Sequence, residues 1–206
     1  MLKPPLKLIL CDLGNVLINF DHRLAVRKIL PFTDKSFDEI YQFFFDSPLT
    51  EKYETGRISS IDFFQSLEKQ LNISHLSYES FIDIWNEIFF ENKGMLELLL
   101  ALKQQYRLHL LSNINELHCT YIQKKFSKNL SIFNKLYFSH EIGFRKPHPE
   151  AYKKSVMDCA YLPQETLYID DREDLIRFAT DLGFQAVLFK SVGQLKSYLQ
   201  QEEVLH

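Results

Sequence analysis

The sequence predicts an α/β fold: a doubly wound parallel sheet with a helical segment inserted after its first strand. Two observations lead to this prediction. Beyond residue 92, short apolar runs alternate with segments of helical periodicity, which is typical of a parallel sheet covered by helices on both faces. Before that point, one apolar run at residues 6–11 is followed by a long stretch with helical signals alone. We therefore assign residues 1–18 and 92–206 to an α/β core domain and residues 19–91 to a helical cap domain.

The first predicted strand, residues 6–11, is short and apolar, and a glycine–asparagine turn signal follows it. The inserted segment then shows the period of amphipathic helices at 23–30, 36–45, 60–71 and 77–90. Ser36, Ser60 and Ser77 stand at three of these helix starts, where serine is a preferred N-cap. Much of the phenylalanine lies in this segment. We interpret these rings as a small helical core rather than a ligand-stacking surface, with a few of them free to line a cleft.

The second half of the chain supplies the other elements of the sheet. Its predicted strands are 108–111, 136–138, 166–169 and 186–189. Its predicted helices are 95–105, 115–126, 149–160, 174–182 and 192–199. Proline suits the first turn of the third of these helices, and Gly183 suits the end of the fourth. Because such alternation produces parallel strands, all of them should end at one edge of the sheet.

Length and composition indicate a globular chain. With 206 residues, of which 46% are hydrophobic and 25% charged, it can form one large domain or a domain with an insertion. A net charge of -3 without a block of basic residues argues against a nucleic-acid surface. No run approaches the roughly 18 apolar residues of a membrane span, and no signal-peptide pattern is recognised. We therefore expect a cytoplasmic protein without nucleic-acid or membrane partners.

The cysteine pattern agrees with this expectation. Cys11, Cys119 and Cys159 are odd in number, and they show neither metal-binding spacing nor a CxxC pair. Such usage suits a reducing compartment.

Polar residues follow three of the predicted strands, at the edge where open α/β sheets bind ligands. These residues are Asp12, the pair Ser112 and Asn113, and the acid pair Asp170 and Asp171. Between them in sequence, Lys146 precedes a predicted helix start. A lysine and a serine can bind a phosphate-sized anion, and clustered carboxylates can hold Mg²⁺. Together these groups are the parts that phosphoryl transfer requires.

Each residue also has an ordinary structural interpretation. Ser112 suits a turn or an N-cap, Asp170 and Asp171 suit the capping of a helix, and Lys146 suits a solvated position. Their joint occurrence with Asp12 at one predicted edge favours the functional interpretation.

Four segments carry a resemblance to a known family. LILCDLGNVL, LLSN, the lysine of GFRKP, and YIDDRED occur in this order on the expected elements. In the order and placement of these four segments, the chain resembles the phosphatases of the haloacid dehalogenase superfamily, whose core is Rossmann-like. DLGNVL, SNINELH and YETGRIS further resemble the subgroup of the α-D-glucose-1-phosphate phosphatase type.

The resemblance implies a role for each matched position. Asp12 would be the nucleophile that forms an aspartyl-phosphate. Ser112, Asn113 and Lys146 would bind the phosphate. The Mg²⁺ ligands would be Asp12, the carbonyl of Gly14, and Asp171, with Asp170 bound through water or orienting its neighbours. Asp174 would hold Lys146 or a metal-bound water.

Gly14 departs from the commonest pattern of that family. Most such phosphatases have an aspartate two positions after the nucleophile, which acts as general acid and then as general base. Glycine leaves out a proton transfer that typically contributes 10² to 10⁴-fold to the rate. The site should therefore suit a leaving oxygen that departs without strong protonation, such as an anomeric, aryl or acyl oxygen.

Charges and aromatic residues near the cap are less specific signals. Asp21 is expected to cap the following helix, and His22 to be structural. Glu54, Arg57 and Arg145 are interpreted either as substrate-facing residues or as solvated loop charges.

We therefore expect a Mg²⁺-dependent phosphomonoesterase whose partner is a small phosphorylated metabolite, with a cap that closes over the site. A metal-independent haloacid dehalogenase is one alternative, against which the acid pair counts. A phosphate-ligand sensor or regulatory protein that lost turnover is the other.

Overall fold

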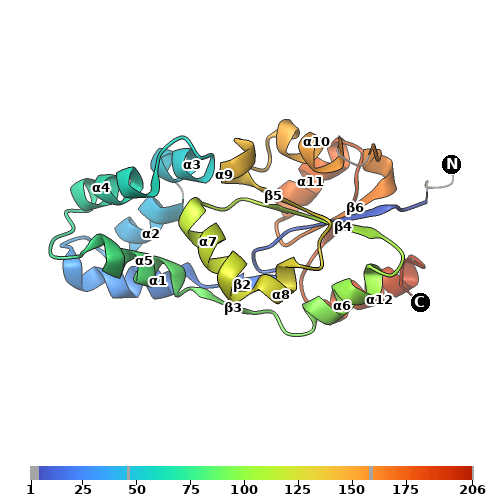
Figure 1. The fold of residues 1–206 in the computed structure, drawn as a ribbon, viewed down its shortest axis with the longest axis horizontal. Helices are drawn as coiled ribbons and strands as arrows, with labels where there is room; N and C mark the ends of the chain where they lie inside the picture. Colours follow the sequence, from blue (N-terminus) through green and yellow to red (C-terminus); the bar gives the residue numbers. More distant parts are fainter. Residues whose placement is uncertain (1–4, 46, 158–159, 206) are drawn as a thin grey trace.

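The computed structural model describes residues 5–45, 47–157 and 160–205. A five-stranded parallel sheet with the order β5-β4-β1-β6-β7 forms its centre (Figure 1). The strands are β1 (Leu8–Cys11), β4 (Arg107–Ser112), β5 (Lys135–Phe138), β6 (Thr166–Asp170) and β7 (Gln185–Leu188). Later strands are added on both sides of β1, so the strand order reverses there. The predicted fold class is confirmed.

Helices cover both faces of this sheet because its strands are apolar on both sides. Ile9 and Cys11 belong to the cluster on one face, and Leu8 and Leu10 to the cluster on the other. The first face is covered by α6 (Met95–Leu102), α7 (Glu116–Lys125), α8 (Ser127–Leu130) and α12 (Val192–Gln201). The second is covered by α10 (Pro149–Met157) and α11 (Glu173–Asp181).

The helical block lies at one end of the molecule, beyond the carboxyl ends of the strands (Figure 1). Its elements are α1 (His22–Ile29), η1 (Leu30–Phe32), α2 (Phe37–Phe45), α3 (Pro48–Glu54), α4 (Ser60–Gln70) and α5 (Tyr78–Asn86). They enclose a core of their own that includes Phe44, Phe63, Phe81 and Trp85. Most of the large rings in this block pack against one another. Phe45 packs at the edge of this core and also lines a cavity.

A short antiparallel ribbon joins the helical block to the sheet. β2 (Ile18–Phe20) pairs with β3 (Phe89–Glu91), so the chain leaves and re-enters the core side by side. The sequence predicted a helix through residue 90, and this was wrong: α5 ends at Asn86. The period of the apolar residues continues through Phe89, but pairing with β2 takes the backbone into an extended conformation. Helical periodicity alone does not reveal such a tertiary pairing.

Local signals also differ from expectation. Ser59, not Ser60, is the N-cap of α4, where its side chain forms a capping box with Asp62. Ser60 is instead hydrogen-bonded to Tyr53 and Glu116. The sequence prediction missed α3, which begins with proline after its Ser47 cap.

Other helix ends differ from the prediction. The helix expected at 95–105 ends at Leu102. Part of the helix predicted to reach residue 160, together with Cys159, lies outside the described residues.

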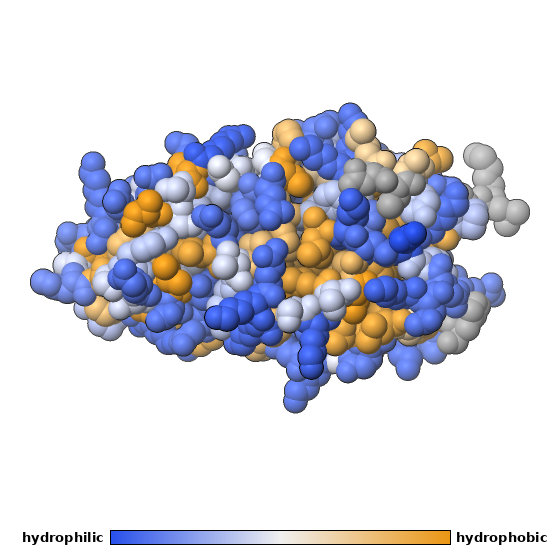
Figure 2. All heavy atoms as spheres, viewed as in Figure 1, coloured by the Kyte–Doolittle hydropathy of each residue, from blue (hydrophilic) through white to orange (hydrophobic). Residues whose placement is uncertain are grey.

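The surface is mixed in character. Figure 2 shows hydrophilic residues over most of one face, with apolar residues gathered towards its middle. Within the described ranges, no helix combines the length and apolar character needed to cross a bilayer.

The aromatic core of the helical block should dominate its stability. Phe81 is 0% exposed, and its ring lies 4.9 Å from that of Phe64 and 5.4 Å from that of Trp85. We predict that Phe81→Ala lowers the free energy of unfolding by about 3–5 kcal/mol, because it removes a buried ring and leaves a cavity. The single tryptophan lies in this cluster, so urea unfolding followed by its fluorescence reports on the block directly.

Phe90→Ala is the matched control, since that ring is 49% exposed. Phe90→Ala should lower the free energy of unfolding by less than about 1 kcal/mol. Equal losses for the two variants would contradict a buried aromatic core in this block.

Candidate active site

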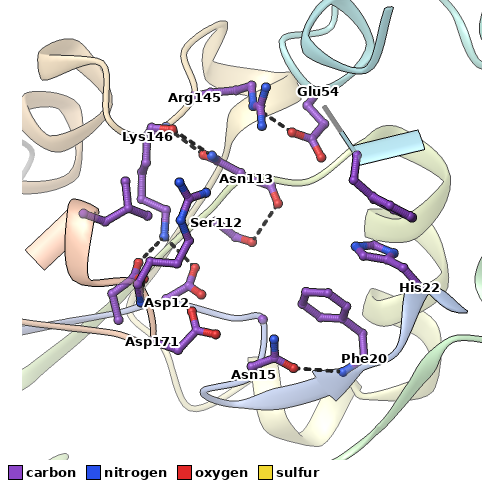
Figure 3. Close-up of a pocket in the computed structure, with 15 residues that line it drawn as sticks. Asp12, Asn15, Phe20, His22, Glu54, Ser112, Asn113, Arg145, Lys146 and Asp171 are labelled. Carbon is purple, nitrogen blue, oxygen red and sulfur yellow. Dashed lines mark hydrogen bonds and ion pairs between the residues drawn. The ribbon is translucent and has the colours of Figure 1, made fainter. Parts of the chain in front are cut away.

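Four chain segments bring polar side chains together at the carboxyl edge of the sheet (Figure 3). Asp12 directly follows β1, Ser112 ends β4, and Asp170 ends β6. Lys146 comes from the loop between α9 (Ser139–Ile142) and α10. All of them line a cavity of about 250 Å³ that lies between the sheet and the helical block. The other predicted core-side residues Gly14, Asn113 and Asp171 also lie on its wall, whereas Asp174 does not.

The side chain of Lys146 links two of the carboxylates. Its Nζ lies 2.6 Å from Asp12 Oδ1 and 2.7 Å from Asp170 Oδ2, and all three side chains are almost fully buried. Burial alone would lower the pKa of Lys146, but the charges of the two carboxylates raise it. The lysine therefore remains charged and fixes the position of Asp12. Burial raises the pKa of Asp12 to about 7, and the attraction of Lys146 opposes this shift.

Backbone contacts hold the lysine loop in place. Lys146 N–H donates to Asn113 Oδ1 at 2.7 Å, and Asn113 Nδ2 donates back to the Lys146 carbonyl at 2.9 Å. The amide of Asn113 is thus used to position the loop that follows α9.

The two acids at the end of β6, Asp170 and Asp171, differ in their contacts. Asp170 accepts hydrogen bonds from Lys146, from the Tyr168 hydroxyl and from Arg172 N–H, so protein donors already contact both of its oxygens. Burial and the charge of Asp170 raise the pKa of Asp171, and the neighbouring Asn15 side chain opposes this shift. Asp170 is therefore suited to orientation, while Asp171 retains capacity for a further ligand.

The donor set fits a hard divalent cation. Asp12, Asp170 and Asp171 each place a carboxylate oxygen within 4.8 Å of those of the other two. Three acids against one buried lysine leave excess negative charge, which explains why burial and mutual repulsion raise the pKa values of Asp12 and Asp171. A cation bound among these oxygens would relieve this repulsion.

Gly14 lies against an aromatic ring. A Cβ atom at this position would lie 2.5 Å from Phe20 Cε1, so a side chain requires the ring to move. Glycine at this position therefore lets β2 and its Phe20 approach the turn that follows Asp12.

Aromatic rings form the wall of the cavity on the side of the helical block. His22 stacks on Phe45 with ring centroids 3.6 Å apart, and Phe20 lies 4.5 Å from His22 (Figure 3). Burial, together with the nearby His118, lowers the pKa of His22. This wall is therefore uncharged, and it offers flat surfaces rather than a proton donor. Asp21 caps α1 as expected.

An ion pair beside this wall links the helical block to the loop that carries Lys146. Glu54 Oε2, at the end of α3, lies 2.7 Å from Arg145 Nε, next to Lys146 (Figure 3). Burial raises the pKa of Glu54, and Arg145 opposes the shift. Both residues line the cavity, so they are not solvated loop charges. Arg57 lines other cavities.

Asp174 does not hold Lys146. Its carboxylate pairs with Arg172, whose Nη2 lies 2.6 Å away, and it is half exposed. The acid lies in the first turn of α11 but outside the cavity lining, and the spacing of YIDDRED does not reveal this placement.

Sequence reasoning missed several residues of the cavity. Phe45 was grouped with the core-forming rings, Phe20 was given no role, and Asn15 was treated only as a turn residue. The nearness of Asn15 to the acidic motif was an available signal. No local signal predicts that Phe45 faces the sheet.

Comparisons with known proteins identify relatives that cover most of the chain. Residues 6–183 match the family described as haloacid dehalogenase-like hydrolase. The chain is 28% identical over 186 residues to the D-ribitol-5-phosphate phosphatase of Bacteroides thetaiotaomicron, covering 87% of this chain and 90% of that one.

Solved structures extend this similarity. A haloacid dehalogenase family enzyme from the same organism, in complex with magnesium and inorganic phosphate, has a TM-score of 0.80 at 28% identity over 91% of this chain and 96% of that chain. The L-2-haloacid dehalogenase of Xanthobacter autotrophicus shares the fold, with a TM-score of 0.65 at 14% identity over 98% of this chain and 85% of that one.

The raised pKa of Asp12 predicts a pH-dependent stability in the absence of metal. The folded carboxyl, with a pKa of about 7, keeps a proton that the unfolded one, near 3.8, has released. Retention of this proton stabilises the folded state at acidic pH, and this stabilisation is lost as the pH rises towards 7. Between about pH 5 and about pH 8, in EDTA, wild-type stability should fall relative to Asp12→Asn by on the order of 1–3 kcal/mol. Urea unfolding at both pH values measures this, and parallel curves for the two proteins would contradict a buried, strained carboxylate.

Proposed function

We propose a function on the premise that the chain belongs to the haloacid dehalogenase-like hydrolases, the family that it matches over residues 6–183. The chain is a Mg²⁺-dependent phosphomonoesterase that acts on a small phosphorylated metabolite, a sugar or polyol phosphate. The observation that carries this proposal is the buried pair of contacts from Lys146 Nζ to Asp12 and Asp170, with Asp171 beside them. This arrangement presents a carboxylate next to a fixed positive charge at a site that can hold a phosphate.

The reaction proceeds in two transfers. A carboxylate oxygen of Asp12 attacks phosphorus, forming a new P–O bond while the bond to the leaving oxygen breaks. The leaving alkoxide takes a proton from water. In the second transfer, water attacks the aspartyl-phosphate, which releases inorganic phosphate and restores Asp12.

The other residues stabilise the charge of these steps. Lys146 stays charged and faces the phosphate oxygens, while the Ser112 hydroxyl offers a hydrogen bond. Asp170 and Asn113 position the lysine. The cation would be held by Asp12, Asp171 and the Gly14 carbonyl, and it supplies neutralisation of the negative charge shared by nucleophile and phosphate.

The cavity supports a small substrate with a hydroxylated chain. Its volume of about 250 Å³ leaves little room beyond a phosphate and a short carbon skeleton. The Glu54–Arg145 pair can accept and donate hydrogen bonds to hydroxyl groups, and the His22–Phe45 stack can cover a carbon face. Similarity to the D-ribitol-5-phosphate phosphatase supports a polyol phosphate as substrate. The motifs DLGNVL, SNINELH and YETGRIS support an anomeric phosphate such as glucose 1-phosphate.

Two other functions compete with this one. A metal-independent dehalogenase has the same nucleophile and fold, but three clustered carboxylates would repel a carboxylate substrate. A phosphate sensor is consistent with the absence of an acid at Gly14. Release of phosphate or halide across a panel of phosphate esters and haloacids, with and without Mg²⁺, separates the three functions.

The assignment of Asp12 and Asp171 predicts distinct losses. Asp12→Asn should reduce phosphate release at least about 10⁴-fold at saturating Mg²⁺, because the amide cannot act as the nucleophile. Asp171→Asn should lower activity and raise the Mg²⁺ concentration needed for half-maximal activity. Steady-state kinetics with a Mg²⁺ titration measures both effects.

Asp181→Asn, an exposed acid at the end of α11, is the matched control and should behave like wild type. Wild-type turnover by Asp12→Asn would refute the mechanism.

Gly14 predicts a steep dependence of the rate on the leaving group. With no acid at this position, aryl and anomeric phosphates should react faster than alkyl phosphates when chemistry limits the rate. Gly14→Asp alone should be hindered by the Phe20 ring. The double variant Gly14→Asp, Phe20→Ala should raise the rate of alkyl phosphate hydrolysis relative to that of aryl phosphate hydrolysis by at least about tenfold.

Phe20→Ala alone is the control, since it creates the space without the acid. A flat dependence on leaving-group pKa in the wild type would mean that another group already donates the proton.

A further inference from the structure

A second cluster of potential metal ligands lies outside the cavity at Asp12. Cys119 on α7 and His140 and Glu141 on α9 place a sulfur, a ring nitrogen and a carboxylate oxygen within 4.8 Å of one another. None of these three side chains lines the cavity at Asp12. We propose that they form a binding site for a soft divalent transition ion, of which Zn²⁺ is the best match.

The imidazole of His140 is already oriented for coordination. Its Nδ1 lies 3.1 Å from the carbonyl oxygen of Ile114. A carbonyl only accepts, so Nδ1 carries the proton and Nε2 presents its lone pair. Nε2 lies 4.0 Å from Glu141 Oε1, on the side of the proposed ion. A ring nitrogen that donates to a backbone carbonyl is the usual support of a metal-bound histidine.

The backbone around the cluster is fixed. The Ser139 hydroxyl accepts a hydrogen bond from Ile114 N–H at 2.9 Å and donates to its carbonyl at 3.1 Å. These two bonds tie the start of α9 to the segment that leads into α7. The ligands therefore come from elements whose relative position does not depend on the ion.

The donor types select the kind of ion. Thiolate and imidazole favour Zn²⁺ over Mg²⁺, which prefers oxygen alone. Binding replaces the S–H bond of Cys119 with a sulfur–metal bond and releases that proton to solvent, with no change of oxidation state. Three protein ligands leave one tetrahedral position for water.

An ion can reach the cluster from solvent. The side chain of Glu141 is 54% exposed, whereas Cys119 is buried. A separate cavity of about 400 Å³, lined by Glu116 and the loop after α3, also borders His140. The sulfur thus lies at the inner side of the site, and the carboxylate at its entrance.

The site lies beneath the contact between the helical block and the sheet. A Cβ atom at Gly56 would lie 2.3 Å from the carbonyl oxygen of His140, so the loop after α3 rests directly on α9. α3 contacts α9, and α5 contacts α7 (Figure 1). An ion that links Cys119 to His140 and Glu141 would join the two core elements on which the helical block rests.

A Co²⁺ titration of the full chain tests the proposal, with Mg²⁺ saturating to occupy the carboxylate site. Wild type should bind one Co²⁺ with a near-ultraviolet thiolate-to-metal charge-transfer band, and Zn²⁺ should displace it. Asp171→Asn should keep the band, because that residue belongs to the other site. Cys119→Ser should lose the band. Absence of the band in folded wild type, or its persistence in Cys119→Ser, would overturn the proposal.

A second variant tests the site without changing the buried cysteine, whose substitution can disturb folding. Glu141→Gln changes a half-exposed side chain and should weaken Co²⁺ binding about tenfold or more. Glu97→Gln, an exposed acid on α6, is the matched control and should bind as wild type does. Equal affinity of Glu141→Gln and wild type would also overturn the proposal. All these outcomes are independent of phosphatase activity.

Discussion

The organisation of the site depends on one buried cation. Lys146 brings its positive charge between Asp12 and Asp170, both of which are largely removed from water. Without it, the two carboxylates would face each other in a medium of low dielectric, where repulsion raises pKa values strongly. The loop that carries the lysine is fixed by Asn113, and Asp170 is fixed by Tyr168 and by the start of α11. Strand ends, loop and helix start are therefore arranged around a single ammonium group.

The two sides of the cavity differ in chemical character. The sheet edge supplies charges and hydrogen-bond donors, whereas α1 and α2 supply the uncharged stack of His22 on Phe45. The Glu54–Arg145 pair connects the two sides electrostatically. In the proposed function, phosphate chemistry and recognition of the rest of the substrate therefore fall to different parts of the chain. Substitutions on the helical side can change selectivity while the reacting groups stay in place.

Sequence reasoning succeeded where the physical rule is local or periodic. The five core strands are short apolar runs between helices, and parallel connection requires their ends to share one edge, so Asp12, Ser112 and Asp170 could be placed there in advance. It failed where partners are distant in the chain. The pairing of Phe20 with Phe89 and the salt bridge of Arg145 with Glu54 join segments that are far apart in the sequence. The separation of Asp174 from Lys146 depends on how α11 is placed in the core.

The ribbon formed by β2 and β3 has a consequence for how such proteins diversify. Both chain crossings between sheet and helical block run through two adjacent, hydrogen-bonded strands. A segment whose ends lie side by side can be lengthened, shortened or exchanged without shifting the register of any strand in the sheet. The helical block can therefore change in length or sequence while the strand ends that carry Asp12, Ser112 and Asp170 keep their positions.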